Sequence, residues 1–500
     1  MLLLKKFNNE DVVIKSHYVL ITNFSKLMYS QTNAHRKMYY CRRCLQHFTT
    51  QVKLDNHIIN CNKINVQKTI FPSKDNKIVS FKNYRYKIPV PFVVYADFEA
   101  LNVPIQEEKQ EEKNKSTEKL TSHKICSYSY KLVCRVNDRF SKTIKIYRGE
   151  NVAKHFIEAM LKEEIYCNKI INENFNKKII MTKEDEENFK ASQECHICNK
   201  KYEKDYKNKV RDHDHRSGKY MGSAHKECNT TFYYKRKLCV FFHNLKGYDS
   251  HFLIQEIGKF DMKMSFLPNN TEKFISFSIG NVYFKDSLQF LSESLDNLTK
   301  NLVKKEISTN NSNVFKYLSN QFKDEKLQLL KRKGIFPYDY LDSFDRFNED
   351  KLPNKEAFYN RLQNTNISDE DYKHAQNVWN TFNMKTFGDY HDLYLKTDVL
   401  LLADIFENFR KLCLDYYKLD PVHYYGTPGI AWDALLKMTR QILELIRDPD
   451  IHLFLEREKK GGMSFAAHRY AKANNKYMAN FDPTKESSYL MYFDANSLYS

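Results

Sequence analysis

The chain has 500 residues, of which 42% are hydrophobic and 69 are aromatic Phe or Tyr (35 plus 34), so it can fill sizeable cores and is not a disordered protein. Lys and Arg number 80 against 62 Asp and Glu, a net charge of +18, which favours a polyanionic partner such as nucleic acid, with a merely soluble basic surface as the alternative. No apolar run approaches the roughly 18 residues of a membrane span, so we expect an intracellular protein without membrane contact, in the nucleus if the host is a eukaryote.

The first predicted element is a zinc finger at residues 39–62. Thiolates and an imidazole recur there as Cys-x2-Cys-x12-His-x3-Cys, a spacing that predicts tetrahedral zinc coordination by a hairpin and a helix. The candidate ligands are Cys41, Cys44, His57 and Cys61. Phe48 and Leu54 have the spacing of the small core of such a finger. We expect an auxiliary contact to DNA or protein, and a purely structural role is the alternative.

The stretch VVYADFEA at residues 93–100 places two carboxylates inside a strand-like apolar run. Because the side chains of a strand alternate, Asp97 and Glu99 share one face with Tyr95. A half-buried strand with one wet face would explain this pattern. Two carboxylates on a rigid strand could also supply half of a site for two divalent cations, which prefer hard oxygen ligands.

A second cysteine cluster occupies residues 195–229. Its candidate zinc ligands are Cys195, Cys198, His225 and Cys228. With its intervening DHDH sequence, the segment resembles the zinc-stapled ββα nucleases similar to phage recombination endonuclease VII, although His225 replaces the cysteine usual there. That resemblance implies that Asp212 and Asn229 hold Mg²⁺ and that His213 acts as general base on water. A structural zinc insertion without nuclease activity is the alternative.

Two later stretches carry further buried carboxylates. Residues 241–257 place Asn244 and Asp249 at a predicted strand-to-helix turn, where Asp249 could also be a simple helix N-cap. Residues 390–409 predict a strongly apolar helix with Tyr394 and Asp398 on one face. An unpaired carboxylate on such a face costs several kcal/mol, so we expect a cation or a hydrogen-bond donor beside Asp398.

Together these stretches resemble the exonuclease motifs of family B DNA polymerases, in the expected order. The matches are DxE (Asp97, Glu99), Nx3YD (Asn244, Asp249) and Yx3D (Tyr394, Asp398). The segments KDSLQFLSESLDNL at 285–298 and TPGIAWDALL at 427–436 extend the likeness. It is greatest to the protein-primed polymerases of self-synthesising DNA transposons and of related viral or linear-plasmid elements.

The order of strand-like and helical segments predicts an α/β or α+β core with insertions. The resemblance implies that residues 90–420 are a ribonuclease-H-like 3′-to-5′ proofreading domain. Residues 1–89 would be an N-terminal region with the finger, and residues 195–229 an insertion into the exonuclease domain. The implied partners are a single-stranded 3′ end of DNA, a primer–template and a terminal priming protein.

The resemblance also implies the roles of the site residues. One Mg²⁺ (or Mn²⁺) would be bound by Asp97, Glu99 and Asp398, and Asp97 would share the other with Asp249. Tyr394 would orient the attacking water. Asn244 would help to seat the 3′ end of a frayed strand.

The last residues resemble the start of a polymerase palm. In YLMYFDANSLYS at 489–500, the likeness to motif A implies that Asp494 binds both catalytic metals and that Tyr499 discriminates against ribonucleotides. The segment KKGG at 459–462 lacks the tyrosine of the family's YxGG linker. We therefore expect residues 421–500 to be a linker and a truncated palm, so that this chain would not polymerise DNA by itself.

Two other interpretations remain open at this point. The chain could be a zinc-dependent DNA-binding protein or a His/Asn endonuclease that carries an inactive polymerase remnant. It could also be an inert element that folds only in part.

Overall fold

The computed structural model describes residues 2–7, 13–32, 37–63, 70–105, 121–174, 176–202, 207–232, 236–270, 272–310, 312–362, 364–458 and 470–491. It divides into two compact units, a body formed by Ser80–Ile442 and a smaller unit formed by Met1–Val79 with Leu443–Ser500. The predicted motif A residues Asp494 and Tyr499 lie outside the described residues, as does the KKGG segment. Within the described ranges, no helix is both long enough and apolar enough to cross a membrane.

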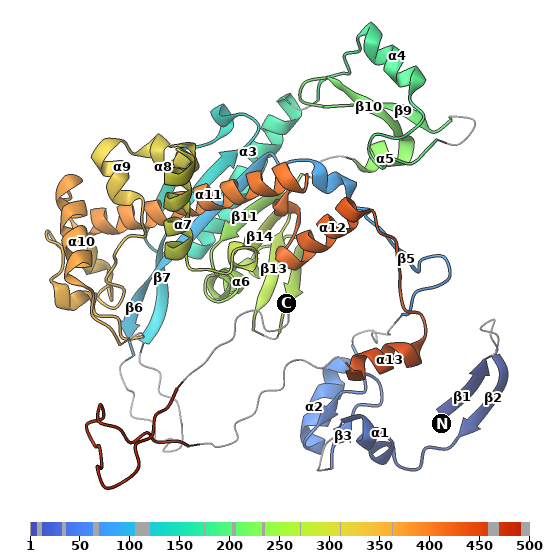
Figure 1. Ribbon diagram of the computed structural model, residues 1–500, viewed down its shortest axis with the longest axis horizontal. Helices are drawn as coiled ribbons and strands as arrows, with labels where there is room; N and C mark the ends of the chain where they lie inside the picture. The colour runs from blue at the N-terminus through green and yellow to red at the C-terminus, as the bar shows by residue number, and fades with distance from the viewer. Residues whose placement is uncertain are drawn as a thin grey trace. The chain divides into compact units, whose positions relative to one another are not determined.

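The body is built on a mixed sheet, which has seven strands in the described part of the chain (Figure 1). Their order is β12 (Met264–Pro268), β13 (Phe274–Ile279), β14 (Val282–Asp286), β11 (Leu238–Phe242), β6 (Phe92–Pro104), β7 (Thr121–Cys134) and β8 (Lys145–Arg148). β11 is parallel to both β6 and β14, and the other neighbouring pairs are antiparallel. The predicted α/β class is therefore confirmed.

The VVYADFEA stretch forms the first half of β6, inside the sheet. Its Val94 and Phe98 pack into a large apolar core with helices α3 (Val152–Asn174) and α6 (Ser250–Ile257). On the other face, the Tyr95 hydroxyl donates a hydrogen bond of 2.8 Å to Glu407 of helix α11. The sheet thus lies between helices, and Asp97 and Glu99 belong to the α11 face.

Helix α11 (Phe387–Tyr416) is the predicted apolar helix of residues 390–409, and it crosses this face of the sheet (Figure 1). It begins with a capping box, in which Thr386 and Asp389 bond each other's backbone N–H groups. The other helices of the body are α7 (Leu295–Thr309), α8 (Lys316–Gln321), α9 (Asp324–Leu330), α10 (Asp369–Thr381) and α12 (Thr427–Thr439). Its short 3-10 helices are η1 (Tyr84–Lys87), η2 (Asp138–Phe140), η3 (Ser287–Gln289), η4 (Ser312–Phe315), η5 (Phe344–Asn348), η6 (Lys355–Phe358) and η7 (Pro421–His423).

The second zinc module lies in the chain between α3 and β11. It consists of α4 (Lys183–Ala191), a hairpin of β9 (Lys209–His213) and β10 (Tyr220–His225), and α5 (Lys226–Thr231). Its apolar centre is small: Cys195, Ile197 and Ala224 are its fully buried members. A core of this size needs another source of stability, such as a metal.

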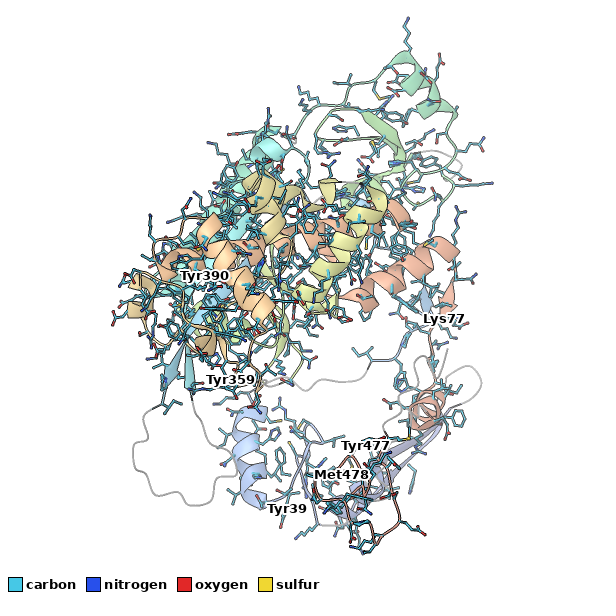
Figure 2. All side chains as sticks on the ribbon, turned by 60° about the vertical axis from the view of Figure 1, so that its left-hand side comes forward. Tyr39, Lys77, Tyr359, Tyr390, Tyr477 and Met478 are labelled. Carbon is cyan, nitrogen blue, oxygen red and sulfur yellow. The ribbon has the colours of Figure 1, made fainter. Side chains whose placement is uncertain are left out.

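The smaller unit is formed by segments from both ends of the chain. Its elements are β1 (Leu2–Phe7), β2 (Val13–Val19), α1 (Phe24–Thr32), β3 (Tyr39–Tyr40), β4 (His47–Phe48), α2 (Gln51–Cys61), β5 (Ile78–Val79), β15 (Leu443–Glu444) and α13 (Pro449–Glu458). β5 pairs with β15, and Lys77 forms an ion pair of 2.6 Å with Glu444. Figure 2 shows the side chains of both units, with Lys77 labelled in this one and Tyr390 in the body.

A buried ion network fixes α11 to the sheet. Arg410 is fully buried, and its guanidinium donates to Asp420 at 2.6 and 3.1 Å, to Glu407, and to the Val90 carbonyl at 2.9 Å. The network connects the helix with the residue two positions before β6 and with the segment that follows the helix. It therefore holds in place the face of β6 that carries Asp97.

Replacing Arg410 by methionine should destabilise the body by about 3–5 kcal/mol, because the Asp420 carboxylate stays buried without its partner. Both tryptophans, Trp379 and Trp432, lie in the body, so their fluorescence in a denaturant titration reports its unfolding. The matched control is Lys411→Met, one residue further along on the exposed side of α11. Equal midpoints for the two variants would show that the network contributes no net stability.

Candidate functional site

The four carboxylates predicted as metal ligands come from three distant parts of the body. Asp97 and Glu99 stand on β6, Asp249 directly precedes α6, and Asp398 lies in α11. Glu99, Asp249 and Asp398 are 8%, 2% and 1% exposed. Asp97 is half-buried, and all four side chains lie around the carboxyl end of β11, where β6 and α11 meet.

The carboxylates lie close enough together for each charge to raise the pKa of its neighbours. Burial, and next the charge of Asp398, raises the pKa of Asp97 from 3.8 to about 7. Burial, and next the charge of Asp97, raises the pKa of Glu99 and that of Asp249 well above their usual ranges. Like charges in a poorly hydrated site produce such shifts, and a bound cation reverses them.

Two of the carboxylate oxygens are left without a partner. Oδ1 of Asp249 and Oδ1 of Asp398 are buried and receive no hydrogen bond from the described residues. Asp249 precedes α6 at the N-cap position, but its side chain makes no capping hydrogen bond. Asp249 is therefore not a helix N-cap through its side chain. Its buried oxygen without a hydrogen-bond partner could instead bind a cation.

The carboxylates are spread more widely than the ligands of a single small ion. In the part of the chain that the structure describes, only the two Cys/His groups bring three or more ligand atoms within 4.8 Å of one another. Three carboxylates that share one small ion would therefore have to move closer together when it binds.

A lysine supplies the cation that the sequence predicted beside Asp398. Nζ of Lys333 lies 2.7 Å from Oδ2 of Asp398. Burial opposes the charge of this lysine, but Asp398 more than compensates and raises the pKa of Lys333. Lys333 itself was missed in the sequence, because one lysine in a chain rich in them carries no recognisable signal.

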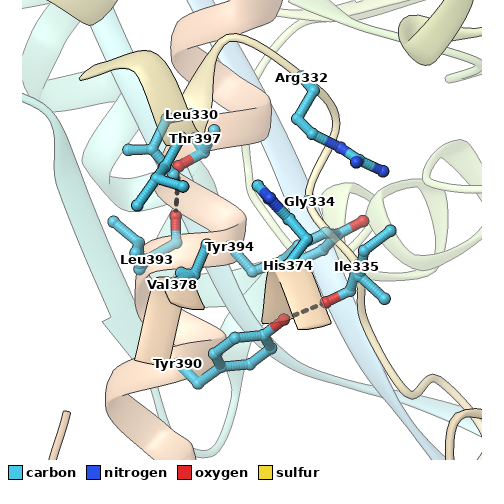
Figure 3. Close-up of a pocket in the computed structure, with 11 residues that line it drawn as sticks. Leu330, Arg332, Gly334, Ile335, His374, Val378, Tyr390, Leu393, Tyr394 and Thr397 are labelled. Carbon is cyan, nitrogen blue, oxygen red and sulfur yellow. Dashed lines mark hydrogen bonds between the residues drawn. The ribbon is translucent and has the colours of Figure 1, made fainter. Parts of the chain in front are cut away.

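The glycine after Lys333 lets its loop lie against Tyr394 (Figure 3). A Cβ atom at Gly334 would stand 2.6 Å from Cδ2 of the Tyr394 ring, so any larger residue would push the two apart. The same loop is held by the Tyr390 hydroxyl, which donates to the Ile335 carbonyl at 2.5 Å. Together these contacts fix the position of Lys333 relative to α11.

Tyr394 itself lies beside the carboxylates. Its hydroxyl is 2.5 Å from that of Tyr338. Burial, and next the charge of Asp398, raises the pKa of Tyr394 well above its usual value, so the hydroxyl keeps its proton. A neutral hydroxyl can both donate and accept a hydrogen bond, which is what the orientation of a water molecule requires.

Asn244 lies in the turn between β11 and Asp249, with a positive φ of 75°. Asp286 holds this turn, because its carboxylate accepts hydrogen bonds from the backbone N–H groups of Asn244 at 2.9 Å and Lys246 at 3.1 Å. The Asn244 amide packs closely over Gly247. Asp286 is the acid of the KDSLQFL segment, and its role as a support of the turn was not predicted.

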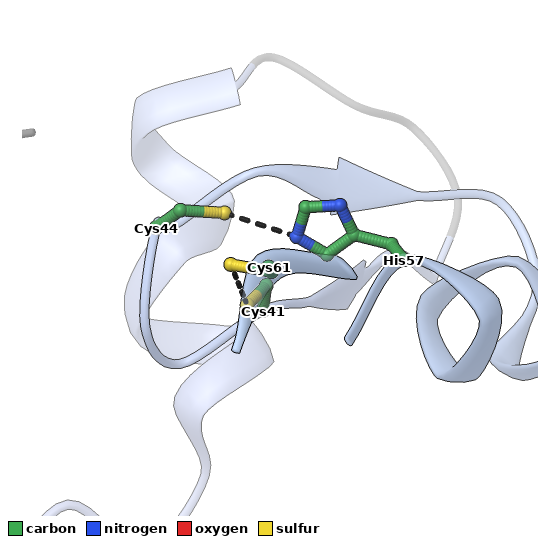
Figure 4. A group of neighbouring side chains, drawn as sticks. All are labelled: Cys41, Cys44, His57 and Cys61. Atoms are coloured by element: carbon green, nitrogen blue, oxygen red, sulfur yellow. Dashed lines mark hydrogen bonds between the residues drawn. The ribbon is translucent and has the colours of Figure 1, made fainter. Parts of the chain in front are cut away.

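The first Cys/His group could bind zinc, as its spacing predicted (Figure 4). The ligand atoms of Cys41, Cys44, His57 and Cys61 all lie within 4.8 Å of one another. The cysteine pair lies at the β3–β4 hairpin, and the other two ligands are on α2. Leu54 of α2 is buried, in agreement with a small finger core.

The second group could bind zinc in the same way, through Cys195, Cys198, His225 and Cys228. Nδ1 of His225 lies 3.4 Å from Sγ of Cys198 and 3.9 Å from Sγ of Cys228. Its other ring nitrogen lies 3.3 Å from the carbonyl oxygen of Lys201. A carbonyl partner of this kind orients a metal-binding imidazole. Histidine can therefore serve as the zinc ligand at this position.

The nuclease residues implied for this module lie on β9 and α5. Asp212 is buried, with one oxygen 2.8 Å from Nε2 of His196 and the other accepting the backbone N–H of His213 at 2.9 Å. Nε2 of His213 lies 3.1 Å from the Lys177 carbonyl oxygen, which requires the proton on that nitrogen and leaves Nδ1 able to accept one. Asn229 lies on α5, and its backbone carbonyl accepts a hydrogen bond from the N–H of Phe232 at 3.2 Å.

A cavity of about 780 Å³ adjoins Asp212 and His213. Four basic side chains also line it, Lys87, Arg216, Arg236 and Lys237, of which Arg216 is paired with Asp214 of the same wall at 3.0 Å. Positive charge beside a histidine that can accept a proton suits a nucleic acid phosphate.

Comparison with known proteins bears on this module alone. Residues 172–243 match the family model described as recombination endonuclease VII. No curated protein and no solved structure matches the chain. The match covers a small part of the sequence and agrees with the likeness seen in its DHDH segment. The chain therefore contains an endonuclease VII-like insertion with a zinc-binding group, which implies binding of DNA.

Proposed function

We propose that the body is the 3′-to-5′ exonuclease domain of a family B DNA polymerase of the protein-primed type, and that it trims single-stranded DNA ends. One observation carries the proposal. Four carboxylates from β6, α6 and α11 gather in one buried site beside Tyr394, and two of their oxygens lack a partner among the described residues.

The sheet supports the same assignment. β6, β7 and β8 form an antiparallel run, while β11 and then β14 lie on the other side of β6 and parallel to it. That strand order is the one expected of a ribonuclease-H-like domain. The carboxylates cluster around the carboxyl end of its central strands, where α/β folds place their sites.

The donor set fits divalent cations. In the proposal Asp97, Glu99 and Asp398 hold one Mg²⁺ or Mn²⁺, and Asp97 and Asp249 hold the other. When bound, such ions supply a Lewis acid for the phosphate and lower the pKa of a bound water. Tyr394 orients the attacking water through its hydroxyl. Lys333 places a positive charge at the same site, where negative charge develops on the phosphate.

The polymerase part of the proposal rests on the motif resemblance alone. Asp494 and Tyr499 lie outside the described residues, so no contact supports their proposed roles. A primer–template and a terminal priming protein are partners that the same resemblance implies.

We propose internal nicking of DNA by the inserted module as a second activity. It is favoured by the family match at residues 172–243 and by His213, whose Nδ1 is left to accept a proton beside a cavity with basic walls. Asp212 and Asn229 would hold its Mg²⁺.

The test is incubation of the purified chain with 5′-labelled single-stranded DNA and Mg²⁺. Exonuclease action gives a ladder of fragments that shorten with time from the 3′ end. Nicking of a supercoiled circular plasmid, which has no ends, reports the second activity separately. A chain that leaves the single strand intact under conditions where both zinc sites are filled would refute the exonuclease proposal.

Magnesium should stabilise the body more at pH 7.5 than at pH 5. The pKa of Asp97 is about 7 in the fold against 3.8 for the unfolded chain, so between these values the fold retains a proton that the unfolded chain has lost. The metal-free body therefore loses stability as pH rises from about 4 to about 7. Mg²⁺ competes with that proton and binds better once it has left.

The measurement is the thermal unfolding midpoint, followed by tryptophan fluorescence, with and without Mg²⁺ at the two pH values. Asp97→Asn should abolish most of the Mg²⁺-dependent increase at pH 7.5. An increase that is the same at both pH values would place the bound Mg²⁺ elsewhere.

A further inference from the structure

A second polar cavity lies in the body, toward the opposite ends of the parallel strands from the carboxylates. It has a volume of about 90 Å³ and lies on the sheet face that carries α11. Cys239 of β11 and Tyr283 and Lys285 of β14 form its floor, and His423 of η7 forms part of its wall. Neither the exonuclease nor the nicking proposal makes use of it.

The feature that needs an explanation is Lys285. This residue is only 4% exposed, and its ammonium group lies over the Tyr425 ring, 5.0 Å from the ring centre, but makes no ion pair with the described residues. Nζ donates instead to two backbone carbonyls, those of Val422 at 2.5 Å and Tyr424 at 3.0 Å. Lysine is almost never fully buried without a charged partner, because carbonyl groups replace only part of its hydration.

The acidic group that acts on Lys285 is already committed elsewhere. Asp420 is fully buried, and both of its oxygens accept hydrogen bonds from Arg410. They also accept the backbone N–H groups of Val90 and Val422. The Asp420 charge is therefore balanced within its own network, and the positive charge of Lys285 is not.

The rest of the cavity wall adds positive charge. Arg85 and Lys237 also line it, and none of its described lining residues is acidic. Burial lowers the pKa of Lys285, and the nearby charge of Lys237 adds to that effect, while Cys239 and Asp420 act in the opposite direction. Two tyrosines line the wall, and each ring has an ammonium group over it: Lys237 lies 3.9 Å from the centre of the Tyr283 ring, and Lys285 lies 5.0 Å from that of Tyr425.

We propose that this cavity binds the phosphate group of a nucleotide, with Lys285 at its base and Arg85 and Lys237 as further donors. The volume is several times the roughly 10–15 Å³ that one water centre needs, which suits a phosphate group. A guanidinium with two ammonium groups matches the charge and the several oxygens of phosphate better than those of a chloride ion.

The phosphate could belong to a free nucleotide or to the 5′ end of a DNA strand. The same side chains would bind the phosphate in both cases. The two sources differ in whether further nucleotides are attached to the 3′ oxygen of the sugar. Because the site uses none of the four carboxylates, the proposal does not depend on nuclease activity.

The test compares binding of thymidine monophosphate and of thymidine to the full-length chain by calorimetry, at constant ionic strength and without added Mg²⁺. All proteins carry Asp97→Ala, so that a nucleotide in the exonuclease site does not contribute. The second pair of ligands is an oligothymidylate with a 5′ phosphate and the same strand with a 5′ hydroxyl.

The deciding variant is Lys285→Met, which removes the charge but keeps the length of the side chain. The variant also leaves the Val422 and Tyr424 carbonyls without their donor, so the ligand-free body should be somewhat less stable, and binding is measured at a temperature where both proteins are folded. Phosphate binding should weaken by about tenfold or more, because a charge-assisted hydrogen bond is lost. Lys154→Met, an exposed site on α3, removes the same charge and should change neither quantity.

Each outcome decides the proposal. Lys285-dependent binding of thymidine monophosphate supports a free nucleotide as the source, and Lys285-dependent preference for the 5′-phosphorylated strand alone supports a strand end. Binding that does not distinguish phosphate from hydroxyl in either pair, or that survives Lys285→Met unchanged, overturns it.

Discussion

Replacing Asp97 by alanine should abolish Mg²⁺-dependent 3′ trimming, with a loss of at least about a hundredfold. Loss of a group that merely supports a metal ligand already costs about 10–100-fold. Asp97 is the carboxylate proposed to be shared between both cations, and its charge acts on both Glu99 and Asp249. The measurement is the initial rate of shortening of 5′-labelled single-stranded DNA.

Loss of folding would not explain such a result. In the absence of metal, Asp97→Ala removes one of several repelling buried charges, so the variant body should be at least as stable as the native one. Asp261→Ala, at an exposed aspartate, is the matched control and should trim normally. His213→Ala should also trim normally and should lose only plasmid nicking. Full trimming activity in Asp97→Ala would show that the four carboxylates are not the exonuclease site.

Removing zinc from the second Cys/His group should unfold the endonuclease VII-like module while the rest of the body stays folded. Structural zinc contributes about 10–16 kcal/mol in small zinc domains, and the module has only three fully buried apolar residues to replace that contribution. Cys195→Ser should lower the zinc content from two equivalents to one. Limited proteolysis should then cut within residues 195–229.

The body provides the internal reference for this experiment. Its tryptophan-reported unfolding should shift little in Cys195→Ser, because its main core includes none of the residues of the module's centre. Cys413→Ser, at a buried cysteine of α11 outside both groups, should keep both zinc equivalents. Two equivalents of zinc in Cys195→Ser, or unchanged resistance to protease, would contradict the assignment of that ligand.

Local patterns predicted those parts of the site that depend on local geometry. Zinc ligands follow from spacing, because a hairpin and a helix fix the distances between them. Because side chains alternate between the two faces of a strand, the sequence alone predicted that Asp97 and Glu99 share one face. For Asp249 the sequence left two roles open, since an N-cap and a metal ligand use the same side chain at the same position.

Long-range contacts account for what the sequence did not predict. Lys333 meets Asp398 across 65 positions of the chain, and no local period marks which lysine will do so. The burial of Lys285 does not follow from its local sequence, because its environment depends on η7, far along the chain. The division into two units was not predicted either, because β5 and β15 are two residues long.

The pairing of β5 with β15 has a consequence for biosynthesis. Val79 faces Leu443, so the polypeptide leaves the smaller unit and returns to it at the same point. During translation, everything from Ser80 to Ile442 emerges from the ribosome before the partner of β5 exists. The order of assembly is thereby set: the body can fold as soon as it is made, and the first unit to be synthesised is the last to be completed.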